Sequence, residues 1–290
     1  MKKGAYTALI TPFNKGKLDM KSFEKIVRYQ VDAGISGILI GGTTGESPNL
    51  STHELELMTN KAREICQNKA EIMLGIGKNS TESVIRLAEE THSWPIDSLL
   101  VVSPYYNKPT QKGLIAHFTA IADKAYKPIV LYNVPGRTSC NILPETVKEL
   151  SQHNNIIAIK EASGSINQAS QIIRSCQDDF LVYSGDDSLT LPMMSVGAAG
   201  VISVASNIIP SEIEELVKSF ISGDFQRSKE LHLLLFDFMK TMFIETNPIP
   251  IKYAASLLGL CSDEYRLPMC GPEEKNMQLI KDSMKKIGIL

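Results

Sequence analysis

The feature that most constrains the fold of this chain is a regular alternation of eight short apolar runs with longer amphipathic stretches. The runs are rich in Ile, Val and Leu and show no strict alternation of apolar and polar residues. Strands buried on both faces have this composition, which is typical of a parallel sheet covered by helices. The predicted strands are Thr7–Ile10, Gly37–Ile40, Ile72–Ile76, Ser98–Val102, Ile129–Tyr132, Ile156–Ile159, Phe180–Tyr183 and Val201–Val204.

Helix start signals fall between these runs. Asp19 and Thr110 are N-cap candidates, and Pro144 suits a first helical position. Ser51 and Glu54 have the spacing of a capping box. Eight strand-then-helix repeats of roughly 20–35 residues predict an α/β protein of the (β/α)8, or TIM-barrel, type. A doubly wound open sheet is the alternative, and the number of strands disfavours it.

The remaining length follows residue 206, where helical periodicity continues without another strong strand. Pro210 and a second Ser-x-x-Glu box, Ser211 to Glu214, predict the first helix of this tail. We therefore expect a catalytic barrel over residues 1–206. We expect C-terminal helices over residues 207–290 that pack on the barrel and form one structural unit with it.

Composition excludes several classes of partner. The formal net charge of −2 argues against a nucleic-acid binder. No apolar run approaches the ~18 residues that span a membrane, and the run after Lys2 and Lys3 is too short for a signal peptide. The five cysteines form no C-x-x-C pair, and the five histidines form no H-E-x-x-H motif. We expect a cytoplasmic protein with no metal site.

Two glycine-rich stretches are weak signals for a nucleotide cofactor. Residues Gly41–Gly45 lack the Lys-Ser/Thr ending of a P-loop, and Ser80 replaces the third glycine of a dinucleotide motif that begins at Gly75. Gly41 and Gly42 would instead let backbone amides approach a small anion closely. The sequence therefore predicts no cofactor.

Polar residues at the ends of the predicted strands indicate chemistry, because TIM-barrel active sites lie at the C-terminal ends of the strands. Lys160 ends the run Ile156–Ile159. Burial favours the neutral form of an amine, which attacks carbonyl carbons and forms Schiff bases. The alternative is a lysine that extends to solvent. Tyr132 ends the neighbouring run and could transfer protons, with Thr43 as a relay; alternatively, it is an ordinary core tyrosine.

Arg137 follows a Pro-Gly pair and is predicted to stand on a loop above the strand ends. A guanidinium there suits bidentate capture of a substrate carboxylate. The alternative is a surface arginine in solvent or in an ion pair.

Together these residues resemble the dihydrodipicolinate synthase family, which belongs to the class I, pyruvate-dependent aldolases. The resemblance covers nearly the whole chain. The matching segments are Gly42–Glu46, Pro104–Asn107, Tyr132–Thr138, Ile159–Ala162, Ser184–Asp187, Gly200–Val204 and Asn247–Pro250.

The resemblance implies a lyase of diaminopimelate and lysine biosynthesis. Lys160 would form an imine with pyruvate, and the derived enamine would attack aspartate 4-semialdehyde to give 4-hydroxy-tetrahydrodipicolinate. Tyr132, Thr43 and Tyr106 would relay protons. In this family Tyr106 is expected to enter from a partner subunit, so the resemblance implies a homo-oligomer, usually a tetramer built as a dimer of dimers.

The resemblance also assigns substrate contacts. Thr44 and the backbone of Ile202 match positions that bind pyruvate, and Gly185 lies close by. Arg137 matches the residue that holds the carboxylate of the semialdehyde. Lysine-sensitive members bind lysine through a histidine and a glutamate, and Leu55 and Ser83 stand at those positions here. We therefore expect weak or absent inhibition by lysine.

Three other functions stay open at this stage. N-acetylneuraminate lyase shares the Schiff-base lysine and the strand-end tyrosine, so these two residues do not discriminate. Thr43–Thr44 and Arg137 favour the synthase. The remaining alternatives are another pyruvate-dependent aldolase and a barrel that binds a keto acid without catalysis.

Overall fold

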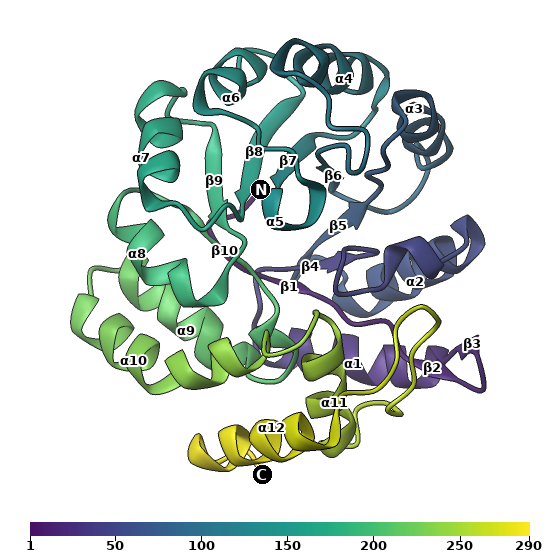
Figure 1. Ribbon diagram of the computed structural model, residues 1–290, viewed down its shortest axis with the longest axis vertical. Coiled ribbons are helices and arrows are strands. Elements are labelled where there is room, and N and C mark those ends of the chain that lie inside the picture. The colour runs from purple at the N-terminus through teal and green to yellow at the C-terminus, as the bar shows by residue number, and fades with distance from the viewer. The chain divides into compact units, whose positions relative to one another are not determined.

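The fold is a closed barrel of eight parallel strands, in a computed structural model that describes all residues 1–290. The strand order around the barrel is β1-β10-β9-β8-β7-β6-β5-β4 (Figure 1). Each predicted run overlaps one of these strands, so the predicted (β/α)8 class is confirmed. The strands are β1 Gly4–Ala8, β4 Gly37–Ile40, β5 Glu71–Gly75, β6 Ser98–Val102, β7 Ile129–Asn133, β8 Ile156–Glu161, β9 Leu181–Ser184 and β10 Gly200–Ser203.

Helices fill the intervals between the strands and make up the C-terminal part. They begin largely where the sequence signals predict. Asp19, Ser51 and Thr110 cap three of them through their side chains, and Glu54 completes the capping box with Ser51. The helices are α1 Met20–Asp32, α2 Thr52–Cys66, α3 Thr81–Glu90, α4 Gln111–Lys124, α5 Pro135–Thr138, α6 Pro144–Leu150, α7 Ile166–Ser175, α8 Thr190–Ser195, α9 Pro210–Ile221, α10 Phe225–Thr241, α11 Ile249–Leu257 and α12 Glu274–Lys286.

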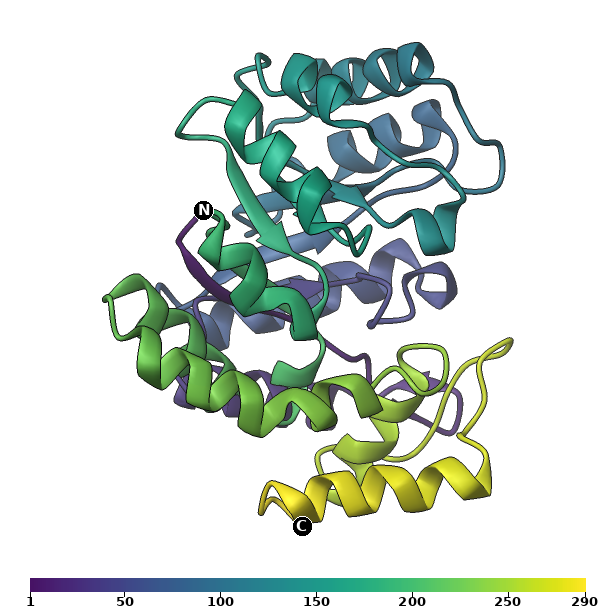
Figure 2. The same ribbon diagram turned by 60° about the vertical axis from the view of Figure 1, so that its left-hand side comes forward.

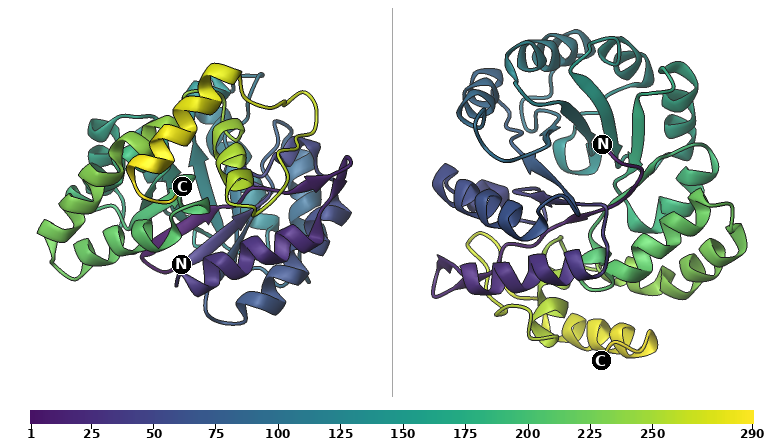
Figure 3. Two further views of the ribbon diagram at one scale, coloured as in Figure 1. Left: turned by 90° about the horizontal axis from the view of Figure 1, so that it is seen from below. Right: turned by 180° about the vertical axis from the view of Figure 1, so that it is seen from behind.

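The chain divides into two compact units, one of which comprises Met1 and residues 73–202. In this unit the helices α3, α4, α6 and α7 follow one another along the outer side of β6, β7, β8 and β9 (Figures 1 and 3). The strands β7 and β8 are aligned so that Tyr132 is opposite Lys160 and Asn133 is opposite Glu161. This alignment brings the two predicted reactive side chains to the same level of the sheet.

The other unit comprises residues 2–72 and 203–290, and so joins the N-terminal strands to the C-terminal helices. Helix α9 is tied to the start of β1, because the buried Glu214 carboxylate accepts hydrogen bonds from the Ala5 amide (2.9 Å) and the Ser36 hydroxyl (2.7 Å). Helix α12 packs against α10 and α11 (Figure 2). No strand follows residue 203, as the sequence predicts.

Three local expectations need correction or addition. The Ser211–Glu214 box is wrong: Ser211 lies inside the first turn of α9, Ile209 is the N-cap without a side-chain bond, and Glu214 bonds to the β1 region instead. The predicted loop after β7 contains a one-turn helix, α5. A short hairpin, formed by β2 Phe13–Asn14 and β3 Lys17–Leu18, was not predicted. The boundary at residue 206 between barrel and extension stays a prediction.

Candidate active site

The centre of the site is a buried amine that lies over an aromatic ring. Lys160 Nζ is 4.4 Å from the centroid of the Tyr132 ring, on the neighbouring strand. Lys160 is only 4 % exposed, and Tyr132 is also buried. No carboxylate forms an ion pair with this amine. The arrangement places an amine, a type of group that can act as a nucleophile, beside a phenol, a type of group that can give or take a proton.

Gly185, which follows β9, leaves the space that the Lys160 side chain occupies. A Cβ atom at position 185 would meet Lys160 Cε at 3.0 Å and Ala162 Cβ at 2.6 Å. The Gly185 amide donates to the Glu161 carbonyl at 2.8 Å, so the backbone is fixed against β8. Any larger residue here would push the lysine away from its present path. The structure thus brings Lys160, Tyr132 and Gly185 together.

Ile202 lies on β10, the strand that pairs with β9 through Gly200–Tyr183 and Val201–Ser184. Ile202 is fully buried on this strand. The contact of its backbone with pyruvate stays a prediction.

A polar layer on the outer side of β7 and β8 was not predicted from the sequence. Asn133 and Glu161 alternate with Tyr132 and Lys160 along the strands, so they face the opposite side of the sheet. Asn133 Nδ2 donates to Glu161 Oε2 at 2.9 Å, and Asn133 Oδ1 accepts from the Ile142 amide at 2.9 Å. These bonds join the strand ends to the segment that follows α5. The sequence signal for this layer is that a second polar residue, Asn133 or Glu161, directly follows Tyr132 and Lys160 at the two strand ends.

Arg137 and Tyr106 are the two exposed members of the predicted set. Arg137 is exposed on α5, whose end is fixed by Thr138 Oγ1 donating to the Cys140 carbonyl at 2.9 Å. Tyr106 is 89 % exposed and has a φ of 75°, in the left-handed region that non-glycine residues seldom adopt. Its side chain therefore projects away from this chain.

The threonine pair of the predicted site lies in the unit that contains the C-terminal helices. Thr43 is half-buried, while Thr44 is buried and its Oγ1 accepts a hydrogen bond from Asn247 Nδ2 at 3.0 Å. Because the amide occupies a lone pair of the hydroxyl, the Thr44 proton remains available for an anionic ligand. The role of Asn247 was not predicted, since 203 residues separate it from Thr44.

No group of three or more His, Cys, Asp or Glu side chains is placed to hold a metal ion. Among the helices, none has the length and apolar character needed to cross a membrane.

A buried lysine beside a tyrosine, at the ends of adjacent strands of an α/β barrel, is an arrangement suited to Schiff-base chemistry. Comparison with known proteins agrees. The sequence model of the Dihydrodipicolinate synthetase family matches residues 1–287. The chain therefore belongs to this family.

Individual relatives are similar over their full length. A 4-hydroxy-tetrahydrodipicolinate synthase from Endomicrobium trichonymphae is 51% identical over 291 residues, which cover 100% of both chains. The crystal structure of dihydrodipicolinate synthase from Thermotoga maritima aligns with a TM-score of 0.98 at 40% identity and covers 100% of both chains. The structure of a monomeric dihydrodipicolinate synthase variant also gives a TM-score of 0.98 at 40% identity, covering 100% of this chain and 98% of the other.

Proposed function

We propose that this chain condenses pyruvate with aspartate 4-semialdehyde to 4-hydroxy-tetrahydrodipicolinate, within diaminopimelate and lysine biosynthesis in the cytoplasm. The observation that carries the proposal is the buried Lys160 amine, 4.4 Å from the Tyr132 ring centroid and without a carboxylate partner. Relatives that match the whole chain at 42–51% identity are named 4-hydroxy-tetrahydrodipicolinate synthase, which supports this substrate pair.

The first step joins pyruvate to the enzyme. The nitrogen lone pair of Lys160 attacks the keto carbon, the carbonyl oxygen leaves as water, and an imine forms between Nζ and that carbon. Loss of a proton from the pyruvate methyl group then gives an enamine, because the iminium nitrogen accepts the electron pair. Burial of the site supports this step, since bulk water would return the imine to ketone and amine.

The second step forms the carbon–carbon bond. The enamine carbon attacks the aldehyde carbon of the semialdehyde, and the aldehyde oxygen takes up a proton. The amine of the condensed substrate then attacks the imine carbon, which closes the ring and releases Lys160. Tyr132, Thr43 and the partner subunit's Tyr106 supply and remove the protons in this proposal. Thr44 and the Ile202 backbone hold the pyruvate carboxylate, with Gly185 close by.

The test of this function is a two-substrate assay with pyruvate held constant. We expect the purified chain to form the cyclic product with aspartate 4-semialdehyde and to show negligible turnover with N-acetylmannosamine. The reverse preference would make the chain a sugar-acid lyase. Pyruvate binding without turnover of either aldehyde would instead indicate a non-catalytic keto-acid binder.

Arg137→Ala tests the proposed contact with the semialdehyde carboxylate. A charge-assisted, bidentate hydrogen bond is worth about 2 kcal/mol, so its loss should lower kcat/KM for the semialdehyde about 30-fold. The KM for pyruvate should change little. Arg86→Ala, an exposed arginine on α3, is the control and should behave as wild type. An unchanged kcat/KM for the semialdehyde in Arg137→Ala would remove Arg137 from the site.

We propose further that the enzyme is a homo-oligomer in which Tyr106 completes the site of a neighbouring subunit, as a dimer or as a dimer of dimers. The 89 % exposure of the Tyr106 side chain in the single chain supports this, since a proton-transfer group needs a confined position.

Mixing two inactive variants tests the exchange of Tyr106 between subunits. In a mixed dimer of Lys160→Ala and Tyr106→Phe, one site combines both defects and the other combines neither. Random pairing of equal amounts should therefore restore about a quarter of the wild-type activity. Activity that stays at the sum of the two separate variants would show that Tyr106 does not act across a subunit boundary.

Lysine is proposed to inhibit this enzyme weakly. Leu55 is a buried apolar residue on α2, and Ser83 carries no charge, so neither position offers a carboxylate to a cationic side chain. The exposed Lys78 adds a like charge. We expect less than half-inhibition at about 1 mM lysine, the affinity range of a few weak contacts. Strong inhibition at micromolar lysine, measured in the same assay, would contradict this reading.

A further inference from the structure

The segment that carries Thr43 and Thr44 is held in a turn with little freedom. The amides of Gly45 and Ser47 donate to the Gly42 carbonyl, at 3.1 Å and 3.3 Å, and Thr11 Oγ1 donates to the Gly45 carbonyl at 2.7 Å. The turn ends at Glu46, whose φ of 55° is in the left-handed region. A side chain in this conformation needs compensating contacts, because the backbone alone disfavours it.

The Glu46 side chain finds those contacts in the C-terminal part of the chain. Lys252 Nζ on α11 donates to Glu46 Oε1 at 2.6 Å, and the Arg266 amide donates to Oε2 at 3.2 Å. The side chains of Lys252 and Glu46 are 0 % and 1 % exposed, so this is a fully buried ion pair. The ammonium also lies 4.2 Å from the Phe13 ring centroid and 5.1 Å from that of Tyr265. Burial lowers the pKa of the Lys252 ammonium, and the Glu46 carboxylate opposes that change.

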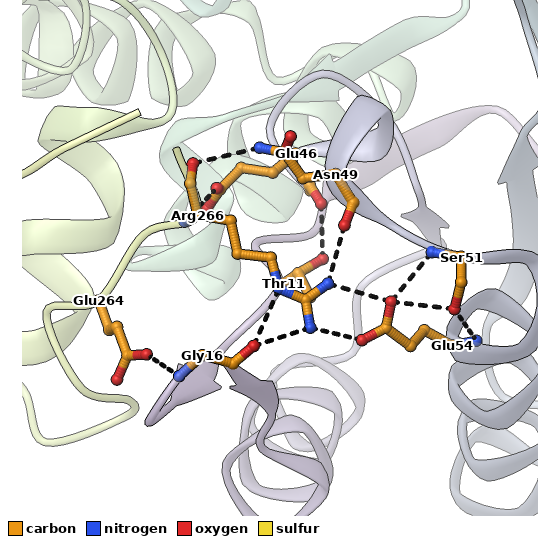
Figure 4. A network of polar contacts seen from close by, with 9 residues as sticks. Thr11, Gly16, Glu46, Asn49, Ser51, Glu54, Glu264 and Arg266 are labelled. Atoms are coloured by element: carbon orange, nitrogen blue, oxygen red, sulfur yellow. Dashed lines mark hydrogen bonds and ion pairs between the residues drawn. The ribbon is translucent and has the colours of Figure 1, made fainter. Parts of the chain in front are cut away.

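Arg266 extends the same connection to the start of α2. Its guanidinium donates to both Glu54 oxygens, at 3.0 Å and 2.5 Å, and to the Asn49 carbonyl at 2.8 Å (Figure 4). It also donates to the Gly16 carbonyl at 3.1–3.2 Å. The hydrogen bonds from Arg266 hold the pKa of the Glu54 carboxyl at about 2. The segment that follows the threonine turn is thus fixed by one C-terminal stretch.

A buried ion pair is an inefficient way to stabilise a fold. Removing two charges from water costs about as much as their attraction returns, and apolar residues of similar volume are often equally stabilising. The pair does fix the position of Glu46 relative to α11. Asn247, two residues before α11, fixes the Thr44 hydroxyl in the same way. The benefit of the pair therefore lies in where it places the threonine turn.

We propose that Lys252 and Glu46 are positioning residues for pyruvate binding, which hold Thr43 and Thr44 in place from the C-terminal helices. This rests on the proposed role of Thr44 in binding the pyruvate carboxylate. Neither residue of the pair touches substrate in this account. Loss of the pair should loosen the turn and weaken pyruvate binding, while the affinity for the semialdehyde changes less.

The experiment compares Glu46→Gln, Lys252→Met and the double variant. Each single variant leaves one buried charge without its partner, so both should have a lower Tm. The double variant has no charge at positions 46 and 252, so its Tm should return most of the way to the wild-type value. Its pyruvate affinity, measured from the pyruvate concentration at which borohydride traps half of the enzyme, should stay about tenfold weaker than in wild type.

Glu214→Gln is the matched control, because Glu214 is a buried carboxylate of the same unit that bonds away from the threonine turn. It should lower the Tm and leave the pyruvate concentration dependence unchanged. The proposal is overturned if the double variant regains wild-type pyruvate affinity together with its Tm, or if Glu214→Gln weakens pyruvate equally. A wild-type enzyme that forms no adduct at any pyruvate concentration would instead reject the proposed function, and this inference with it.

Discussion

Burial of the Lys160 amine without a carboxylate partner is the constraint on which the rest of the site depends. An amine that is shielded from bulk water and forms no ion pair can meet a substrate carbonyl without first leaving another partner. The barrel supplies that environment by aligning β7 with β8, which sets the Tyr132 ring 4.4 Å from Nζ. Gly185 contributes by having no side chain, which leaves room for the side chain of Lys160.

Comparison with Lys252 clarifies why the two buried lysines differ in role. Both are buried and both approach an aromatic ring. Lys252, however, donates to Glu46 at 2.6 Å, and an ammonium held by such a partner has no free lone pair with which to attack a carbonyl. A single carboxylate partner thus distinguishes Lys252, the proposed positioning residue, from Lys160, the proposed nucleophile.

The sequence predicts the strand framework well because buried parallel strands have an apolar composition that few other elements share. The bounds of β4 and β6 match the prediction, and the strand-end positions predict that Lys160 and Tyr132 lie side by side. The first predicted strand begins at Thr7, whereas β1 begins three residues earlier, at Gly4. Ser211 is not a cap, because α9 already begins at Pro210 and its N-cap is Ile209.

Contacts between distant parts of the chain could not be predicted. Lys252 and Glu46 are 206 residues apart, and nothing in either local sequence indicates the other. The segment that follows α5 is held to β7 by the bond between the Ile142 amide and Asn133, which only the folded chain creates. Such contacts arise from tertiary packing, and a pattern of hydrophobic residues carries no record of them.

Reductive trapping with pyruvate tests the central claim most directly. The enzyme is incubated with labelled pyruvate and borohydride, digested, and the labelled peptide is identified by mass spectrometry. The account predicts one adduct, on Lys160, that disappears in Lys160→Arg while Lys252 stays unlabelled. An adduct on Lys252, or one that persists in Lys160→Arg, would contradict it.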